Sequence, residues 1–166
     1  MEKYQSPFAY PEEHMRLLGI IAAHWEALEL LLEIILAELM LHQHGRIGLL
    51  TAHISYANKM DLVTIYVRSA YGQDKEDPRW TEFNKIKTRV TKAYADRNKY
   101  VHARWHYSKE TGSVLRNDVR TKGGKLDLVD EITTTTMMEA VAKEIADAGV
   151  AFTTFFAELG VQPYAP

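Results

Sequence analysis

The chain has 166 residues, 46% of them hydrophobic and 25% charged, with a net charge of −2 and no cysteine. This length and balance predict a single domain over residues 1–166 and exclude an intrinsically disordered chain. The missing cysteines exclude disulfides, thiolate nucleophiles and cysteine-based metal sites. No signal-peptide-like segment opens the sequence, and glutamates interrupt the longest apolar stretch, 28–41, so we expect a cytoplasmic protein without a membrane span.

Three helical regions are predicted before residue 104, because apolar residues recur there every three or four positions. Gly48 and Ser55 divide the second region into a short turn and a longer helix. Asp77 followed by Pro78 is an N-cap with a first-turn proline, which starts the third helix. The three regions cover about 11–44, 47–71 and 78–103.

The helical period is lost over about 104–131, where two short runs flank Lys122-Gly123-Gly124 as in a β-hairpin. The segment His102–Tyr107 is a candidate for a third strand. A last helix follows, with Thr136 and Glu139 spaced as a capping box. These elements predict an all-α fold, an antiparallel bundle of four to five helices with a small β-hairpin inserted before the last helix.

Basic residues gather in one part of the chain. Residues 85–125 carry a net charge of +9, whereas residues 126–166 carry −6. Such a block is typical of a surface that binds a polyanion. A solvated helix face followed by a polar hairpin also explains it, so charge alone leaves both interpretations open.

Most motifs of cofactor and metal chemistry are absent from the sequence. The nine glycines are scattered and form no phosphate-binding loop, and no G-x-S-x-G elbow occurs. His42 and His44 would point in different directions on a helix, so they would not share a metal ion there. We therefore expect neither a metal nor a cofactor.

One segment inside the basic block combines residues suited to phosphate chemistry. It is Ala95-Asp96-Arg97-Asn98-Lys99-Tyr100-Val101-His102-Ala103-Arg104-Trp105, at the end of the third predicted helix. Arg97, the Asn98 that follows it, and His102 after a four-residue gap resemble the R-x4-6-H motif of the HEPN superfamily (higher eukaryotes and prokaryotes nucleotide-binding domains). Two upstream stretches also resemble helices of that family, at Trp25, Glu26, Leu28 and Ser55–Lys59.

The resemblance implies a compact helical bundle that is commonly a homodimer. Many members are metal-independent endoribonucleases of toxin–antitoxin or phage-defence systems, whereas others bind nucleotides or proteins without catalysis. One branch pairs with nucleotidyltransferases and carries a tyrosine two residues after the histidine, where this chain has Arg104. The expected partners are RNA or a nucleotide, a second copy of the chain, and an antitoxin or a nucleotidyltransferase.

The residue types suit RNA cleavage without a metal, in which the 2′-hydroxyl attacks the phosphate and leaves a 2′,3′-cyclic phosphate. We expect His102 to act as general acid and base, since imidazole can exchange protons near neutral pH. Arg97 would clamp the phosphate, and Asn98 would fix an oxygen or the imidazole tautomer. The expected substrate-binding residues, by charge and stacking, are Lys99, Tyr100, Arg104 and His106.

An ideal helix would not bring Arg97 and His102 together, because residues five apart differ by about 140° around the axis and about 7.5 Å along it. We therefore expect a composite site across a dimer axis, or fraying after Val101 that redirects His102. Without a functional site, Arg97 would pair with Asp96 or an acid of another helix, and His102 would only complement the helix dipole.

Three functional hypotheses follow. The leading one is a metal-independent endoribonuclease that holds RNA on residues 85–125. The second is a non-catalytic nucleotide- or protein-binding helical module that uses the same pocket. The third is a dimerising scaffold whose basic block only solubilises its surface, which predicts no salt-dependent affinity for RNA.

Overall fold

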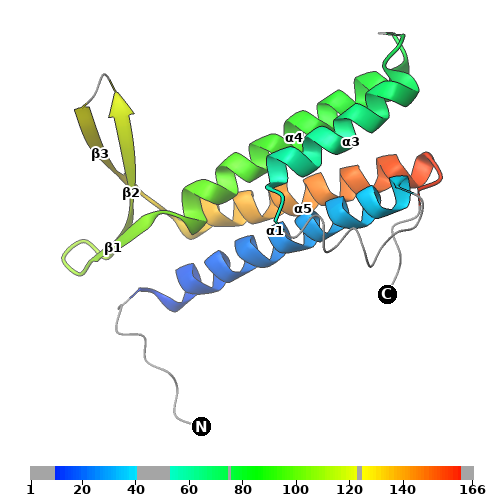
Figure 1. The fold of residues 1–166 in the computed structure, drawn as a ribbon. Helices are drawn as coiled ribbons and strands as arrows, with labels where there is room; N and C mark the ends of the chain where they lie inside the picture. Colours follow the sequence, from blue (N-terminus) through cyan, green and yellow to red (C-terminus); the bar gives the residue numbers. More distant parts are fainter. Residues whose placement is uncertain (1–9, 41–52, 75, 123–124, 162–166) are drawn as a thin grey trace.

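The computed structural model of the protein describes residues 10–40, 53–74, 76–122 and 125–161. These residues form four helices and a small three-stranded antiparallel sheet that precedes the last helix (Figure 1). The helices are α1 (Glu12–Leu39), α3 (Tyr56–Tyr71), α4 (Pro78–Val101) and α5 (Thr135–Glu158). The strands are β1 (Arg104–Ser108), β2 (Ser113–Lys122) and β3 (Lys125–Ile132). The structure confirms the predicted helical fold with a β insertion before the last helix.

Local capping signals set where the central helices begin. The Ser55 hydroxyl accepts a hydrogen bond from the backbone N–H of Asn58 and caps α3. The Asp77 carboxylate accepts one from the backbone N–H of Arg79 and caps α4. Each bond satisfies a backbone donor that a helix start leaves without a partner. Both starts agree with the prediction from the sequence.

The start of α5 differs from the prediction. Thr134, not Thr136, is the N-cap, and its hydroxyl accepts a hydrogen bond from the backbone N–H of Met137. The reason lies in the sheet, because the backbone N–H of Thr133 donates to Val114 O and ends the strand pairing there. The next residue is therefore the first one free to cap a helix.

The ends of the predicted elements are only partly within the described residues. α1 ends at Leu39 with Met40 as its C-cap, before the predicted end near residue 44. Residues 41–52, with His42 and His44, lie outside the described residues. The Gly-Gly turn at 123–124 lies outside them too, although Lys122 pairs with Lys125 on either side of it. The sheet has three strands where the fold prediction counted a hairpin, because β1 adds to β2.

The hydrophobic core fills the space among the four helices. α5 packs against both α1 and α4, and the largest buried side chains come from all four helices. The core includes Trp25, Val63, Phe83, Phe152 and Phe156.

The sequence predicts an antiparallel bundle, but some of the helices run in the same direction. α3 and α4 are antiparallel, since a short loop joins them (Figure 1). α1 and α5 are parallel, because His24 contacts Ala142 whereas Leu31, farther along α1, shares a groove with Thr153, farther along α5.

α4 and α5 are antiparallel, because the sheet joins them at one end and Phe83, early in α4, packs on Phe155, late in α5. The alternation is interrupted between α1 and α3, where Tyr56 contacts Trp25 and Lys59, farther along α3, contacts Glu33, farther along α1, so these two helices run in the same direction.

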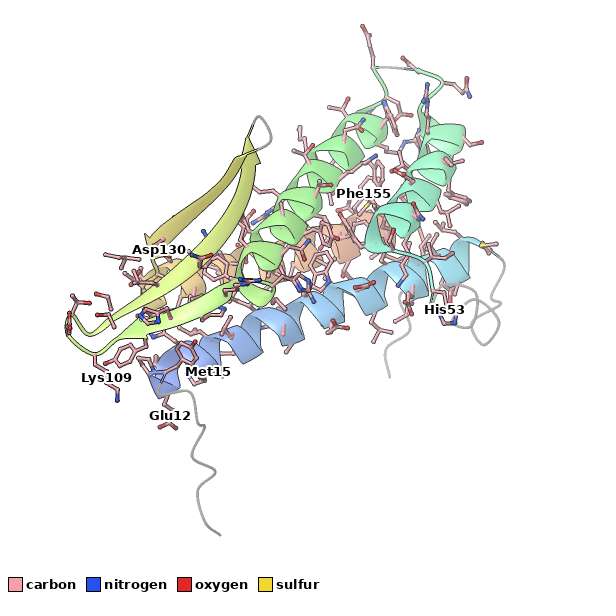
Figure 2. All side chains as sticks on the ribbon, turned by 60° about the vertical axis from the view of Figure 1, so that its left-hand side comes forward. Glu12, Met15, His53, Lys109, Asp130 and Phe155 are labelled. Atoms are coloured by element: carbon pink, nitrogen blue, oxygen red, sulfur yellow. The ribbon has the colours of Figure 1, made fainter. Side chains whose placement is uncertain are left out.

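The sheet lies at one end of the helices and joins α4 to α5 (Figure 1). In Figure 2 Lys109 and Asp130 mark this end, near Glu12 and Met15 of α1, whereas His53 lies toward the opposite end. The end of α4 is therefore next to the sheet.

The packing predicts very different costs for two substitutions on α5. Phe152 is 0% exposed and packs on Phe156 with ring centroids 5.0 Å apart, whereas Val150 is 67% exposed. We expect Phe152→Ala to lower the free energy of unfolding by about 3–5 kcal/mol, because it leaves a cavity. Val150→Ala should change it by less than about 0.5 kcal/mol. Urea unfolding of both variants checks this, and similar losses in the two would contradict the packing.

Candidate functional site

The site forms where α4 ends. The helix stops at Val101, two residues before the predicted end, and His102 is its C-cap with φ −100° and ψ 3°. The backbone N–H of His102 still donates to Asn98 O at 3.2 Å, and β1 begins at Arg104. Because His102 has left the helical spiral, its side chain is not held 140° from Arg97.

Arg97, Asn98 and His102 meet within one chain. Arg97 Nη1 lies 3.0 Å from Asn98 Oδ1 and 3.0 Å from His102 Nε2. The expected divergence of Arg97 and His102 is therefore wrong, because it assumed a helix that continued through residue 102. The alternative of a helix end that redirects His102 describes the structure. Bringing these two residues together does not require a second copy of the chain.

The contact favours one tautomer of the imidazole. A guanidinium can only donate hydrogen bonds, so His102 Nε2 is the acceptor of the one from Arg97 Nη1. The tautomer that fits this contact carries its proton on Nδ1. A neutral imidazole with a lone pair on Nε2 is the form that a general base needs. The ring is exposed, so a ligand can reach it.

The rest of the Arg97 guanidinium faces α1. Nη2 lies 3.9 Å from Glu26 Oε1, which is too long for a hydrogen bond. Nε is buried and has no hydrogen-bond partner among the described residues. The side chain as a whole is 15% exposed. Asp96 does not pair with Arg97, because it binds Lys92 and Lys99 instead.

The sheet holds the end of α4 in place. Trp105 Nε1 donates to Tyr100 O at 3.1 Å, which satisfies a carbonyl of the last helical turn. The Arg116 guanidinium lies over the Tyr100 ring at 5.1 Å and also pairs with Glu131. Trp105, Arg116 and Glu131 are opposite one another on the three strands. This row therefore connects the sheet to the turn that positions His102.

Tyr100 is buried in this contact, so its ring is not on the exposed surface where we expected it to bind substrate. The reason is the last turn of α4, which directs Tyr100 under Arg116 and Trp105. Burial raises the pKa of the Tyr100 hydroxyl, while the charge of Arg116 partly opposes that rise.

The other expected substrate-binding residues are exposed. Arg104 and His106 alternate with Trp105 along β1, so they lie on the face of the sheet turned away from Tyr100. Lys99 is exposed, but its Nζ lies 2.7 Å from Asp96 Oδ1. The structure thus leaves the side chains of Lys99, Arg104 and His106 at the surface beside the end of α4.

Acidic residues neutralise part of the basic block. Burial alone would raise the pKa of Asp96, but hydrogen bonds from Lys99 and Lys92 outweigh it and lower that pKa. Arg89 pairs with Glu144 and Asp147 of α5. The segment 85–125 therefore presents less positive charge than its composition suggests.

A charged cluster that the sequence analysis did not single out lies beside the site. Lys59 of α3 is 4% exposed, and its Nζ lies 3.0 Å from Glu29 Oε1 and 2.5 Å from Glu33 Oε1 of α1. Burial alone would lower the pKa of Lys59, but the hydrogen bonds to Glu33 and Glu29 outweigh it and raise that pKa. The available signal was the spacing of Glu26, Glu29 and Glu33, which puts all three on one face of α1.

Comparisons with known proteins give no further guidance. No protein-family model, curated protein or solved structure matches the chain. Within the described residues, no group of three or more His, Asp or Glu side chains is arranged to hold a metal ion. None of the described helices is long and apolar enough to cross a membrane. Function must therefore be argued from the geometry of the site.

The contact predicts one imidazole tautomer. When its ring is neutral, His102 should carry the proton on Nδ1 and leave Nε2 unprotonated, because Arg97 donates to Nε2. Long-range proton–nitrogen NMR of the ¹⁵N-labelled protein distinguishes the tautomers. Arg97→Ala should remove this preference, and an Nε2-protonated ring in the unsubstituted protein would contradict the geometry.

The Lys59 cluster predicts a pH-dependent stability. Lys59→Met should lower the free energy of unfolding at neutral pH by about 3 kcal/mol, since it leaves Glu29 and Glu33 without their cation. Because the folded pKa of Lys59 is raised, the difference between the two proteins should be complete below about pH 10 and vanish as the pH rises through that folded pKa.

Denaturant unfolding between pH 7 and pH 12 measures this difference. Lys143→Met is the matched control, because Lys143 is 75% exposed and its one ion pair among the described residues is an exposed pair with Asp147. It should change stability by less than about 0.5 kcal/mol. An equally small effect of Lys59→Met would show that the cluster does not stabilise the fold.

Proposed function

We propose that the protein is a metal-independent endoribonuclease of the HEPN type and that the end of α4 is its active site. The observation that carries the proposal is the position of Arg97 Nη1, 3.0 Å from both Asn98 Oδ1 and His102 Nε2. Side by side, a guanidinium can clamp the phosphate and an unprotonated imidazole can accept the 2′-hydroxyl proton in phosphodiester cleavage.

The reaction starts when a phosphate of RNA binds Arg97. Its oxygens accept the Nη1 hydrogen bond that His102 holds in the free protein, so the Nε2 lone pair becomes available. His102 Nε2 then takes the proton of the 2′-hydroxyl while the 2′-oxygen bonds to phosphorus. The bond from phosphorus to the 5′-oxygen breaks, and that oxygen takes up a proton from water, while the protonated His102 returns its proton to the solvent. The products are a 2′,3′-cyclic phosphate and a 5′-hydroxyl.

Each neighbouring residue has a separate part in this scheme. Arg97 stabilises the negative charge that grows on the phosphate oxygens, because it stays protonated throughout. Asn98 fixes the orientation of Arg97 through its Oδ1. Lys99, Arg104 and His106 hold the flanking nucleotides.

A homodimer belongs to this proposal, with a role different from the one expected at first. Since Arg97 and His102 already meet in one chain, a second copy would add a second site rather than complete the first. A toxin or defence role, with an antitoxin or a nucleotidyltransferase as partner, likewise stays part of the proposal.

A non-catalytic nucleotide- or protein-binding module is the second candidate. The observation that favours it is that Arg97 already occupies the His102 Nε2 lone pair and is itself mostly covered. If a bound phosphate did not displace this contact, the site would bind an oxyanion without accepting a proton. This candidate predicts affinity for nucleotides without turnover.

A cleavage assay on single-stranded RNA with excess EDTA tests the proposal. The protein should cleave in the chelator and leave 2′,3′-cyclic phosphate ends. His102→Ala and Arg97→Ala should each lower the rate at least about 100-fold, because each removes a group needed in the transition state.

His53→Ala is the control, since His53 is also exposed but lies toward the opposite end of the helices (Figure 2). It should leave the rate unchanged. Cleavage that persists in His102→Ala, or that disappears with EDTA, would contradict the proposal. Nucleotide binding with no cleavage in any buffer would favour the second candidate.

A further inference from the structure

We propose that Glu26 is an internal competitor for the oxyanion that binds Arg97. In the free protein its carboxylate faces the guanidinium, and a phosphate must displace it to bind. The inference rests on the proposed role of Arg97 as the phosphate-binding residue. It adds a regulatory element on α1, outside the segment that resembles a motif.

The first observation is the geometry of the pair. Arg97 Nη2 makes no hydrogen bond among the described residues, and Glu26 Oε1 lies 3.9 Å from it. The two charges attract at this distance without a directed hydrogen bond. The Glu26 side chain is 71% exposed, so it has the freedom to approach Arg97 or to leave it.

The second observation concerns the neighbours of Glu26 on α1. Glu29 and Glu33 follow it on the same face, and both are held by Lys59. Glu26 shares no salt bridge with Lys59, and its one ion pair among the described residues is with Arg97. Of these three glutamates, Glu26 is therefore the one that would move when an anion binds Arg97.

The third observation is the space beside Glu26. A groove of about 540 Å³ between α1 and α3 is lined by Glu26, Leu30, Glu33 and Lys59, among others. The Glu26 side chain can turn into this groove when an anion arrives at Arg97. Because Lys59 lies in the groove between its two carboxylates, the displaced Glu26 carboxylate would remain near a cation.

The expected consequence is a moderate gain in anion affinity when the charge is removed. Exposed ion pairs stabilise weakly, so Glu26→Gln should tighten phosphate binding by about threefold to fivefold. The gain should shrink as salt rises, because the pair is accessible to solvent. A residue that positioned Arg97 for binding would have the opposite effect, since its loss would weaken binding.

Titration with inorganic phosphate, followed through the His102 ring resonances in NMR, measures this affinity at a binding step that needs no cleavage. The proteins are the unsubstituted chain, Glu26→Gln, Arg97→Ala and the double variant. Glu12→Gln is the charge-matched control, because Glu12 is also an exposed glutamate on α1 but lies about four helical turns away from Glu26. Glu12→Gln should leave the affinity unchanged.

The account expects tighter binding in Glu26→Gln and no gain from the same change when Arg97 is already replaced. Unchanged or weaker binding in Glu26→Gln would overturn the inference, as would a gain that persists in the double variant or appears equally in Glu12→Gln. These outcomes are separate from failure of the proposed function. If Arg97→Ala leaves phosphate binding intact, the phosphate role of Arg97 itself is wrong.

Discussion

The hydrogen bond from Arg97 Nη1 to His102 Nε2 depends on one local event, the end of α4 at Val101. A single further helical turn would carry His102 around the axis and away from Arg97. The sheet prevents that turn. Trp105 satisfies the carbonyl of Tyr100, and Arg116 covers the Tyr100 ring, so the chain leaves the helix at a fixed point. The β insertion is therefore part of what builds the site.

Salt bridges reduce the positive charge that residues 85–125 present at the surface. Their composition predicts a strongly positive surface, but Arg89, Lys92, Lys99 and Arg116 are each paired with acids. Beside the site, attraction of a polyanion would then come from the exposed face of β1 and the end of α4. On the α1 side of the site lie Glu26, Glu29 and Glu33. Under the proposed function, RNA would therefore approach Arg97 from the sheet side rather than from the side of Glu26.

The sequence predicts what local chemistry controls. The caps at Ser55 and Asp77 follow from short-range hydrogen bonds, and the loss of helical period marks the β insertion. The features that the sequence does not predict are controlled by long-range packing. The parallel direction of α1 and α5, the burial of Tyr100 and the pairing of Lys59 all involve residues far apart in the chain.

The Arg97–His102 contact depends both on local chemistry, which the sequence predicts, and on long-range packing, which it does not. The spacing identifies both residues, and helix geometry alone says that they diverge. Only the helix end, set by the sheet, reverses that conclusion. The cap of α5 is a smaller case, since four consecutive threonines offer similar chemistry and a strand hydrogen bond decides among them.

A kinetic double-mutant cycle tests most directly whether Arg97 and His102 act as one unit. Single-turnover RNA cleavage would be measured in EDTA for the unsubstituted protein, Arg97→Ala, His102→Ala and the double variant. If the two groups act on the same phosphodiester, the double variant should lose little more activity than either single variant. Losses that multiply, or a single variant with full activity, would show that the two side chains do not form one active site.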